Sequence, residues 1–102
     1  MRDKLNWHVL ELVIPVGRAH AISRTKLAEK LKLPDRYMRR MIAAAQRDGM
    51  IICNDQDGRG YYQPQSVADI ERAYKQERSR ALATLVKLKT MRQQLKNAGR
   101  NV

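Results

Sequence analysis

The stretch of sequence that decides the fold is Ser23–Ile52, which reads SRTKLAEKLKLPDRYMRRMIAAAQRDGMII. Its apolar spacing predicts a short helix over Arg24–Lys32 and a longer, arginine-rich helix over about 35–48. Ser23 suits the N-cap of the first helix, because its hydroxyl oxygen can accept a hydrogen bond from an amide of the first turn. Gly49 is a natural end for the second helix.

A turn at Leu33–Asp35 separates these two helices, since Pro34 disfavours a helical conformation in the residue before it. Apolar residues recur on one side of each helix and form the predicted buried faces. These residues are Leu27, Ala28 and Leu31 in the first helix and Met38, Met41, Ile42 and Ala45 in the second. The arginines of the second helix then lie mainly outside that buried face.

A β-hairpin is predicted after the second helix, with strands at Ile51–Asn54 and Tyr61–Gln63. The Asp57-Gly58 pair between two such strands is a strong hairpin signal. Side chains alternate along a strand, so Tyr61 and Tyr62 point to opposite faces and one of them joins the core.

An N-terminal helix is expected over about residues 3–14 and ends before Pro15. The residues that recur at helical spacing along its predicted inner face are Leu5, His8, Val9, Leu12 and Val13. Trp7 is most simply a core residue. The segment Ala19–Ile22 is a candidate minimal strand that could pair with the hairpin.

Residues 66–98 contain no proline or glycine and predict a long amphipathic helix of about 50 Å, with a flexible tail at 99–102. Its expected buried positions are Ala81, Leu82, Leu85, Leu88, Met91 and Leu95. Such a stripe can pair with a second copy, lie back across the first helix, or bind another protein. Dimerisation is the expected outcome.

The predicted architecture is therefore mainly α with a small β-hairpin. Residues 1–65 form one domain and 66–98 a dimerisation or partner-binding element. The chain has 21 Lys and Arg against 10 Asp and Glu, a net charge of +11, which favours a polyanionic partner. Residues 24–47 carry eight basic and two acidic side chains, and residues 67–102 carry nine basic and three acidic ones, so two basic regions flank a nearly neutral hairpin.

Other classes of function find little support. No catalytic or phosphate-binding motif is present, so an enzyme is not expected. His8, His20 and Cys53 do not have the spacing of a zinc site, and we expect no metal or cofactor. We recognise no membrane span and no signal peptide, and a single cysteine suits a reducing cytoplasm, which is the expected location.

The apolar pattern from Leu27 to Ile51, with Ala28 and Gly49 in place, resembles the winged helix-turn-helix DNA-binding superfamily over residues 5–64. The overall plan is similar to small prophage-type winged-helix proteins of Gram-positive bacteria. In that superfamily the second helix of the motif enters the major groove of DNA, and the hairpin, called the wing, contacts the backbone or minor groove.

The resemblance and the positions of the basic residues together identify the candidate DNA contacts. They are Arg24, Thr25 and Lys26 at the start of the first helix of the motif, Arg36, Tyr37, Arg39, Arg40 and Arg47 in the second, and Arg59 in the wing. The family usually has basic residues at the wing tip, whereas here Asp55 and Asp57 accompany Arg59. Two carboxylates facing phosphates would offset that arginine.

The sequence thus predicts a protein that binds double-stranded DNA and regulates transcription, without a small-molecule cofactor and with a homodimer as the expected assembly. The alternative is a protein-interaction adaptor or an accessory subunit of a phage-type replication or packaging assembly. These hypotheses differ in where the arginines lie: exposed on one positive face for DNA, or engaged in contacts within the protein for an adaptor.

Overall fold

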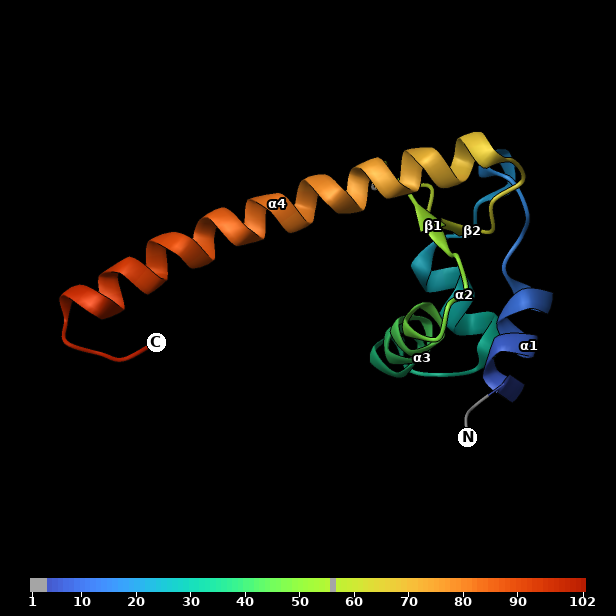
Figure 1. Ribbon diagram of the computed structural model, residues 1–102. Helices are drawn as coiled ribbons and strands as arrows, with labels where there is room; N and C mark the ends of the chain where they lie inside the picture. The colour runs from blue at the N-terminus through green and yellow to red at the C-terminus, as the bar shows by residue number, and fades with distance from the viewer. Residues whose placement is uncertain (1–3, 56) are drawn as a thin grey trace.

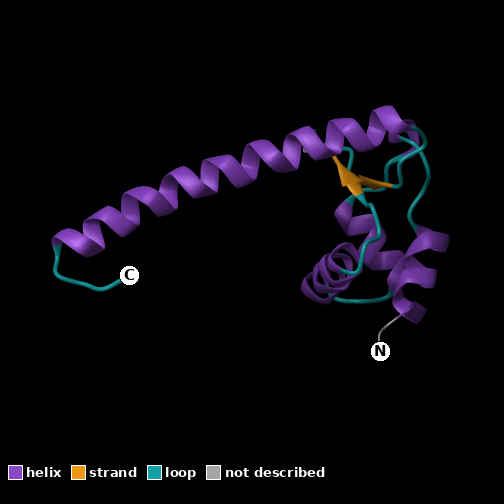
Figure 2. Ribbon diagram, in the orientation of Figure 1, coloured by secondary structure: helices purple, strands orange, loops and turns teal. Residues whose placement is uncertain are grey.

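The computed structural model describes residues 4–55 and 57–102, with side chains from residue 8 onward. The elements in chain order are α1 (Lys4–Val13), the 3₁₀ turn η1 (Arg18–His20), α2 (Arg24–Leu31), α3 (Asp35–Arg47), β1 (Cys53–Asn54), β2 (Tyr61–Tyr62) and α4 (Val67–Asn97) (Figure 1). The protein is mainly helical, with one antiparallel hairpin and a long C-terminal helix (Figure 2). The predictions for the side chains of Leu5 and Trp7 lie outside the described side chains. The predicted inner face of α1 is wrong for His8, Val9 and Leu12, which are exposed, because Leu10 and, directly after the helix, Ile14 are buried instead.

The turn between α2 and α3 has a defined cap on each side. The Ser23 hydroxyl oxygen accepts a hydrogen bond of 3.2 Å from the Lys26 amide, as the sequence predicts. Lys32 adopts the left-handed conformation and ends α2 one residue earlier than expected. Pro34 is the N-cap of α3, which begins at Asp35, so the turn covers residues 32–34.

The hydrophobic core lies where α1, α2, α3 and the segment entering β1 converge. Its buried residues are Leu10, Ile14, Ile22, Leu27, Met38, Ile42, Ala45, Met50 and Ile52. The predicted buried faces of α2 and α3 are confirmed, because Leu27, Met38, Ile42 and Ala45 belong to this core and Ala28, Leu31 and Met41 pack against it. The opposite side of α3 therefore faces away from the core.

The hairpin is shorter than predicted, since the ladder joins only Cys53 to Tyr62 and Asn54 to Tyr61. Before it, the Met50 amide donates to the Ala45 carbonyl oxygen at 3.0 Å, which ties this part of the chain to the end of α3. Tyr62 is buried and Tyr61 half-buried, which confirms that they point to opposite faces.

The predicted strand at Ala19–Ile22 is wrong for most of its length, because its first residues form the 3₁₀ turn η1. Only Ile22 pairs with the hairpin, through two backbone hydrogen bonds of 2.8 and 2.9 Å with Tyr61. Gly60 permits this approach: its φ is +105°, and a Cβ there would lie 2.0 Å from the Ile22 carbonyl oxygen.

Helix α4 contacts the rest of the protein only near its start and then projects away from it (Figure 1). Every residue from Glu77 to Val102 is exposed. The predicted buried positions Ala81, Leu82, Leu85, Leu88, Met91 and Leu95 are therefore exposed in the single chain, and packing of this stripe on the first helix is wrong. After Gly99 the chain turns back, with the Arg100 amide donating to the Leu95 carbonyl oxygen at 2.9 Å.

None of the described helices has the length and apolar character required to cross a lipid bilayer.

Candidate nucleic-acid interface

Three arginines form an exposed row along α3. Arg36, Arg40 and Arg47 are separated by four and seven residues, which places them on one face of the helix, opposite the buried Met38 and Ala45. The row extends about 16 Å along the axis at 1.5 Å per residue. This face of α3 presents guanidinium groups to solvent over its whole length.

Tyr37 lies beside the first two arginines of this row. The guanidinium carbons of Arg36 and Arg40 are 5.4 and 5.6 Å from the centre of the Tyr37 ring, a distance typical of cation–π contacts. The ring is 46% exposed. The contacts restrict two long side chains while their donor nitrogens stay accessible, so the cluster is partly preorganised for an anionic partner.

Arg24 and Arg39 both pair with Asp35, at the N-terminus of α3. The Arg24 Nε atom is 3.1 Å from Asp35 Oδ1, and the Arg39 Nε atom is 3.0 Å from Asp35 Oδ2. Both arginines remain more than half exposed. One carboxylate thus compensates part of the charge of two predicted DNA contacts, while Arg36 and Arg40 are grouped around Tyr37 instead.

The first turn of α2 exposes Arg24, Thr25 and Lys26, as the sequence predicts. The Lys26 amide is already bonded to Ser23, so Lys26 is available to an anion through its ammonium group rather than through its backbone. These three side chains lie on the same small domain as the α3 row, and Arg24 is tied directly to the start of α3 through Asp35.

The two carboxylates of the hairpin loop, Asp55 and Asp57, do not both face outward as expected. Asp55 is only 6% exposed and pairs with Arg18 and Arg72. Asp57 pairs with Arg18 at 2.9 Å and with Arg59 at 3.5 Å, and it accepts a hydrogen bond from the Arg59 amide. The prediction that both carboxylates face outward against Arg59 is therefore wrong for Asp55.

The charge balance of this loop also shifts two pKa values. The Arg59 backbone amide, followed by the Arg18 side chain, holds the pKa of Asp57 below its ordinary value. The hydrogen bond from Arg18 to Asp57 raises the pKa of that guanidinium. Arg59 itself is 57% exposed and stays accessible at the loop.

A second network joins the hairpin to the start of α4. The Tyr62 hydroxyl donates to Asp55 at 2.7 Å, and Arg72 donates to Asp69 at 2.7 Å. Asp69 also accepts from the Gln65 amide at 2.9 Å, and this bond is the main reason why its pKa is lowered. The bond between Arg72 and Tyr62 raises the pKa of Arg72.

Sequence reasoning missed Arg18 and Arg72 as partners of the hairpin loop, because Asp55 and Asp57 lie far from them along the chain. The local signals were the pair of acidic residues, Asp55 and Asp57, in a basic protein and the i,i+3 spacing of Asp69 and Arg72. These two arginines determine the position of the loop and of α4, and so they act on the candidate interface indirectly.

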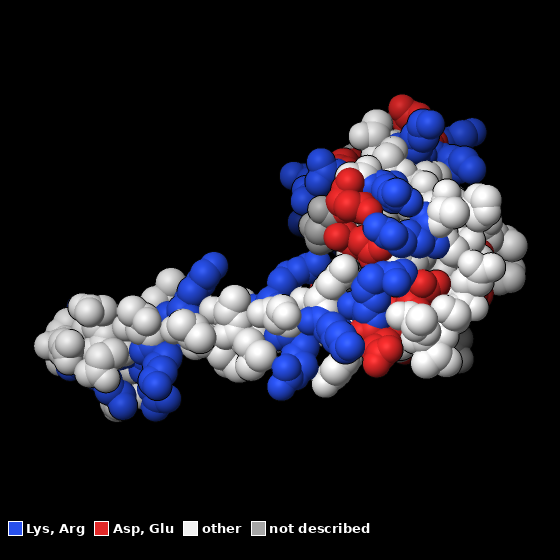
Figure 3. Space-filling model, turned by 90° about the horizontal axis from the view of Figure 1, so that it is seen from above, with Lys and Arg blue, Asp and Glu red and all other residues white. Residues whose placement is uncertain are grey.

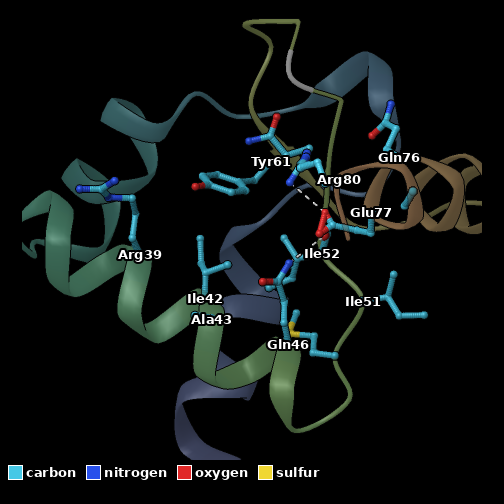
Figure 4. A pocket seen from close by; sticks show the side chains of 13 residues that line it. Arg39, Ile42, Ala43, Gln46, Ile51, Ile52, Tyr61, Gln76, Glu77 and Arg80 are labelled. Atoms are coloured by element: carbon cyan, nitrogen blue, oxygen red, sulfur yellow. Dashed lines mark hydrogen bonds and ion pairs between the residues drawn. The ribbon is translucent and has the colours of Figure 1, made fainter. Parts of the chain in front are cut away.

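A shallow groove runs between α3, the hairpin and the first turns of α4 (Figure 4). Its lining mixes apolar side chains such as Ile42 with the Glu77–Arg80 ion pair of 2.9 Å. The Gln46 side chain donates to the Ile52 carbonyl oxygen at 3.1 Å across the groove.

Among the described residues, no three His, Cys, Asp or Glu side chains are grouped as metal ligands. Cys53, the first residue of β1, is buried, and this burial raises the pKa of its thiol.

Charge is distributed unevenly over the molecule. On the face seen in Figure 3, acidic and basic side chains alternate over the globular part, whereas the outer part of the projecting helix shows only basic and uncharged ones.

Comparison with known proteins identifies no relative, since no family model, curated protein or solved structure matches the chain significantly. The functional assignment therefore rests on the chemistry of this chain's own side chains.

Proposed function

We propose that the protein is a winged helix-turn-helix protein that binds double-stranded DNA and regulates transcription. In this proposal α2 and α3 are the helix-turn-helix, and the hairpin is the wing. The α3 helix enters the major groove, which at about 12 Å is wide enough to admit a helix.

The observation that carries the proposal is the exposed row Arg36, Arg40 and Arg47 opposite the buried face of α3. Arginine can donate two parallel hydrogen bonds to the O6 and N7 atoms of guanine, and it also binds phosphates. Tyr37, held between two of these arginines, can donate to a phosphate or pack on a thymine methyl group.

The remaining predicted contacts have supporting roles in this proposal. Arg24, Thr25 and Lys26 are placed to bind the phosphate backbone beside the groove, where contacts fix position rather than read sequence. Arg39 adds a phosphate contact when its guanidinium binds a DNA phosphate in addition to Asp35. The exposed Arg59 guanidinium of the wing can reach the backbone, because Arg18 shares its partner Asp57 and Asp55 is paired with Arg18 and Arg72.

The second candidate is a protein-interaction adaptor in a larger assembly. The observation in its favour is the outer part of α4, whose residues 77–97 are all exposed and bear an apolar stripe. The pairing of Arg24 and Arg39 with Asp35 also favours an adaptor, because those two arginines already make contacts within the protein.

The test compares two double variants in a titration of fluorescent duplex DNA followed by anisotropy at several salt concentrations. We expect Arg36→Ala/Arg40→Ala to weaken binding by at least tenfold, since each guanidinium that contacts a base contributes about 1–3 kcal/mol. The slope of log K against log salt should become shallower by about 0.9 for each phosphate that the variant no longer neutralises.

The matched control is Arg78→Ala/Arg92→Ala, which removes the same charge from exposed positions of α4. It should weaken binding far less than the α3 variant. Equal weakening in both variants would indicate unspecific attraction by net charge and would contradict the proposed role of α3. Absence of binding by the unmodified chain would favour the adaptor.

A further inference from the structure

The outer half of α4 presents an apolar stripe that the single chain leaves uncovered. Leu85, Leu88, Met91 and Leu95 are between 43 and 59% exposed. They belong to a broad stripe based on steps of three and four residues, the spacing by which one helix packs on another. Residues 78–97 extend it over roughly 30 Å at 1.5 Å per residue.

The returning tail deepens this stripe into a groove. Val102 lies against it, and the Arg92 guanidinium donates to the main-chain oxygen of Val102 at 3.5 Å. The floor is formed by leucine and methionine side chains, with Lys89 and Arg92 on its rim. An apolar floor with a cationic rim is suited to an amphipathic segment that carries negative charge beside its apolar face.

The charge of this half-helix is of one sign. After Glu77 the sequence contains no acidic residue, whereas seven basic residues follow: Arg78, Arg80, Lys87, Lys89, Arg92, Lys96 and Arg100. The three carboxylates of α4 lie nearer its start, and each has a basic partner on the same helix, in the pairs Asp69–Arg72, Glu71–Lys75 and Glu77–Arg80.

This distribution disfavours a second copy as the occupant. If Ala81, Leu88 and Leu95 define the centre of the seam, the flanking positions include Arg78, Arg80, Lys87 and Arg92. Residues at these flanks face each other across a pair of helices and determine which partners associate. Two copies would bring like charges together in both the parallel and the antiparallel arrangement, which costs association energy.

We propose that the outer half of α4 docks an amphipathic helix of a partner protein whose apolar face is flanked by Asp or Glu. Such a helix covers the exposed leucines and compensates the basic flanks together. A nucleic acid would compensate the charge but leave the apolar floor uncovered, so a protein helix fits more of what the surface presents. This docking does not depend on DNA binding by α3.

The test uses the full chain and two synthetic helical peptides of matching length. Both have Ile and Leu in the seam; one carries Glu at both flanks and the other carries Lys. Anisotropy of the labelled peptides should show binding of the Glu peptide at least about tenfold tighter than that of the Lys peptide. The chain alone should sediment as a monomer at micromolar concentration.

Two variants separate docking from plain attraction of opposite charges. Leu88→Gln should weaken binding of the Glu peptide at least about tenfold, whereas Val86→Gln, an exposed position on the other side of the helix, should leave it unchanged. Lys87→Glu/Arg92→Glu should reverse the preference in favour of the Lys peptide.

Several results would overturn the proposal. They are a stable dimer of the chain alone that Leu88→Gln dissociates, a monomer that binds neither peptide, and binding of the Glu peptide that is indifferent to Leu88→Gln. DNA binding, measured on the same Leu88→Gln variant, should be retained, so that failure of docking and failure of the α3 interface are distinguished.

Discussion

At the start of α3, the Asp35 carboxylate lies 3.1 Å from Arg24 and 3.0 Å from Arg39. We expect Asp35→Asn to tighten DNA binding several-fold at low salt, because it removes a negative charge from the surface that would face phosphates. Stability should fall by less than about 1 kcal/mol, since exposed ion pairs and a helix N-terminal carboxylate each contribute little. Anisotropy and urea denaturation measure the two effects.

The control for this substitution is Glu71→Gln, which removes one exposed carboxylate from α4, away from α3. It should change DNA affinity much less. If Asp35→Asn weakened binding while the fold stayed intact, Asp35 would be needed to orient the two arginines, and the expected repulsion would be wrong.

At the scale of residues, the sequence predicted the exposure of Arg36 and Arg40 because each lies two residues, about half a helical turn, from a buried residue, Met38 or Ile42. It could not predict that Arg39 and Arg24 share Asp35. That pairing depends on how α2 packs on α3, and helical spacing within α3 accounts only for the Asp35–Arg39 half of it.

Among the elements, the hairpin and α4 are joined through the nearly buried Asp55, which contacts Arg18, Arg72 and the Tyr62 hydroxyl. We expect Asp55→Ala to destabilise the fold by about 3 kcal/mol, because the Tyr62 hydroxyl loses its acceptor and Arg18 and Arg72 each lose one of their carboxylate partners at a nearly buried site. Urea denaturation measures the change in unfolding free energy. Glu71→Ala, an exposed carboxylate, should stay within about 0.5 kcal/mol, and an equal effect of both changes would contradict a buried network.

The capped start of α4 predicts a dependence of stability on pH. The pKa of Asp69 is lowered in the folded chain, so the unfolded chain binds a proton first as the pH falls. Stability from Asp69 is therefore present above the ordinary aspartate pKa and is lost as pH falls through the folded value. Asp69→Asn should be less stable at pH 7 and lose less stability between about pH 5 and pH 2, as thermal denaturation can show. A curve parallel to that of the unmodified chain would exclude this role.

The order of helices and hairpin was predictable from local signals such as Ser23, Pro34, Gly49 and Asp57-Gly58. The predicted strand at Ala19–Ile22 was wrong, because only Ile22 in this segment pairs with Tyr61. That close approach requires Gly60 in a positive-φ conformation, which alternation of apolar residues does not reveal.

The whole molecule is elongated, with a Cα radius of gyration of 17.0 Å and extents of 51 × 30 × 26 Å. A compact domain of this length would have a radius near 13 Å. Small-angle scattering of the monomer should therefore give a value close to 17 Å, together with the mass of one chain. A monomer near 13 Å would mean that α4 packs back on the domain in solution.

The sequence predicted the length of α4 from the absence of proline and glycine between Ser66 and Ala98. It left open whether the helix folds back, dimerises or projects. That choice depends on the angle at its root, where Asp69 and Arg72 connect to the hairpin, and no periodicity within α4 encodes this angle.

The rigid connection at the root of α4 has a geometric consequence for anything attached to its far end. Each residue of an α-helix advances the chain by 1.5 Å and rotates it by about 100°. Inserting one alanine between Lys75 and Ala81 would leave both surfaces intact but swing the outer groove about a quarter turn around the axis, whereas inserting seven would nearly restore its bearing. The helix therefore fixes both the distance and the rotation between the α3 face and the outer groove. The effect of insertions on simultaneous binding of DNA and a partner helix should vary with the helical period rather than grow steadily with the length of the insertion.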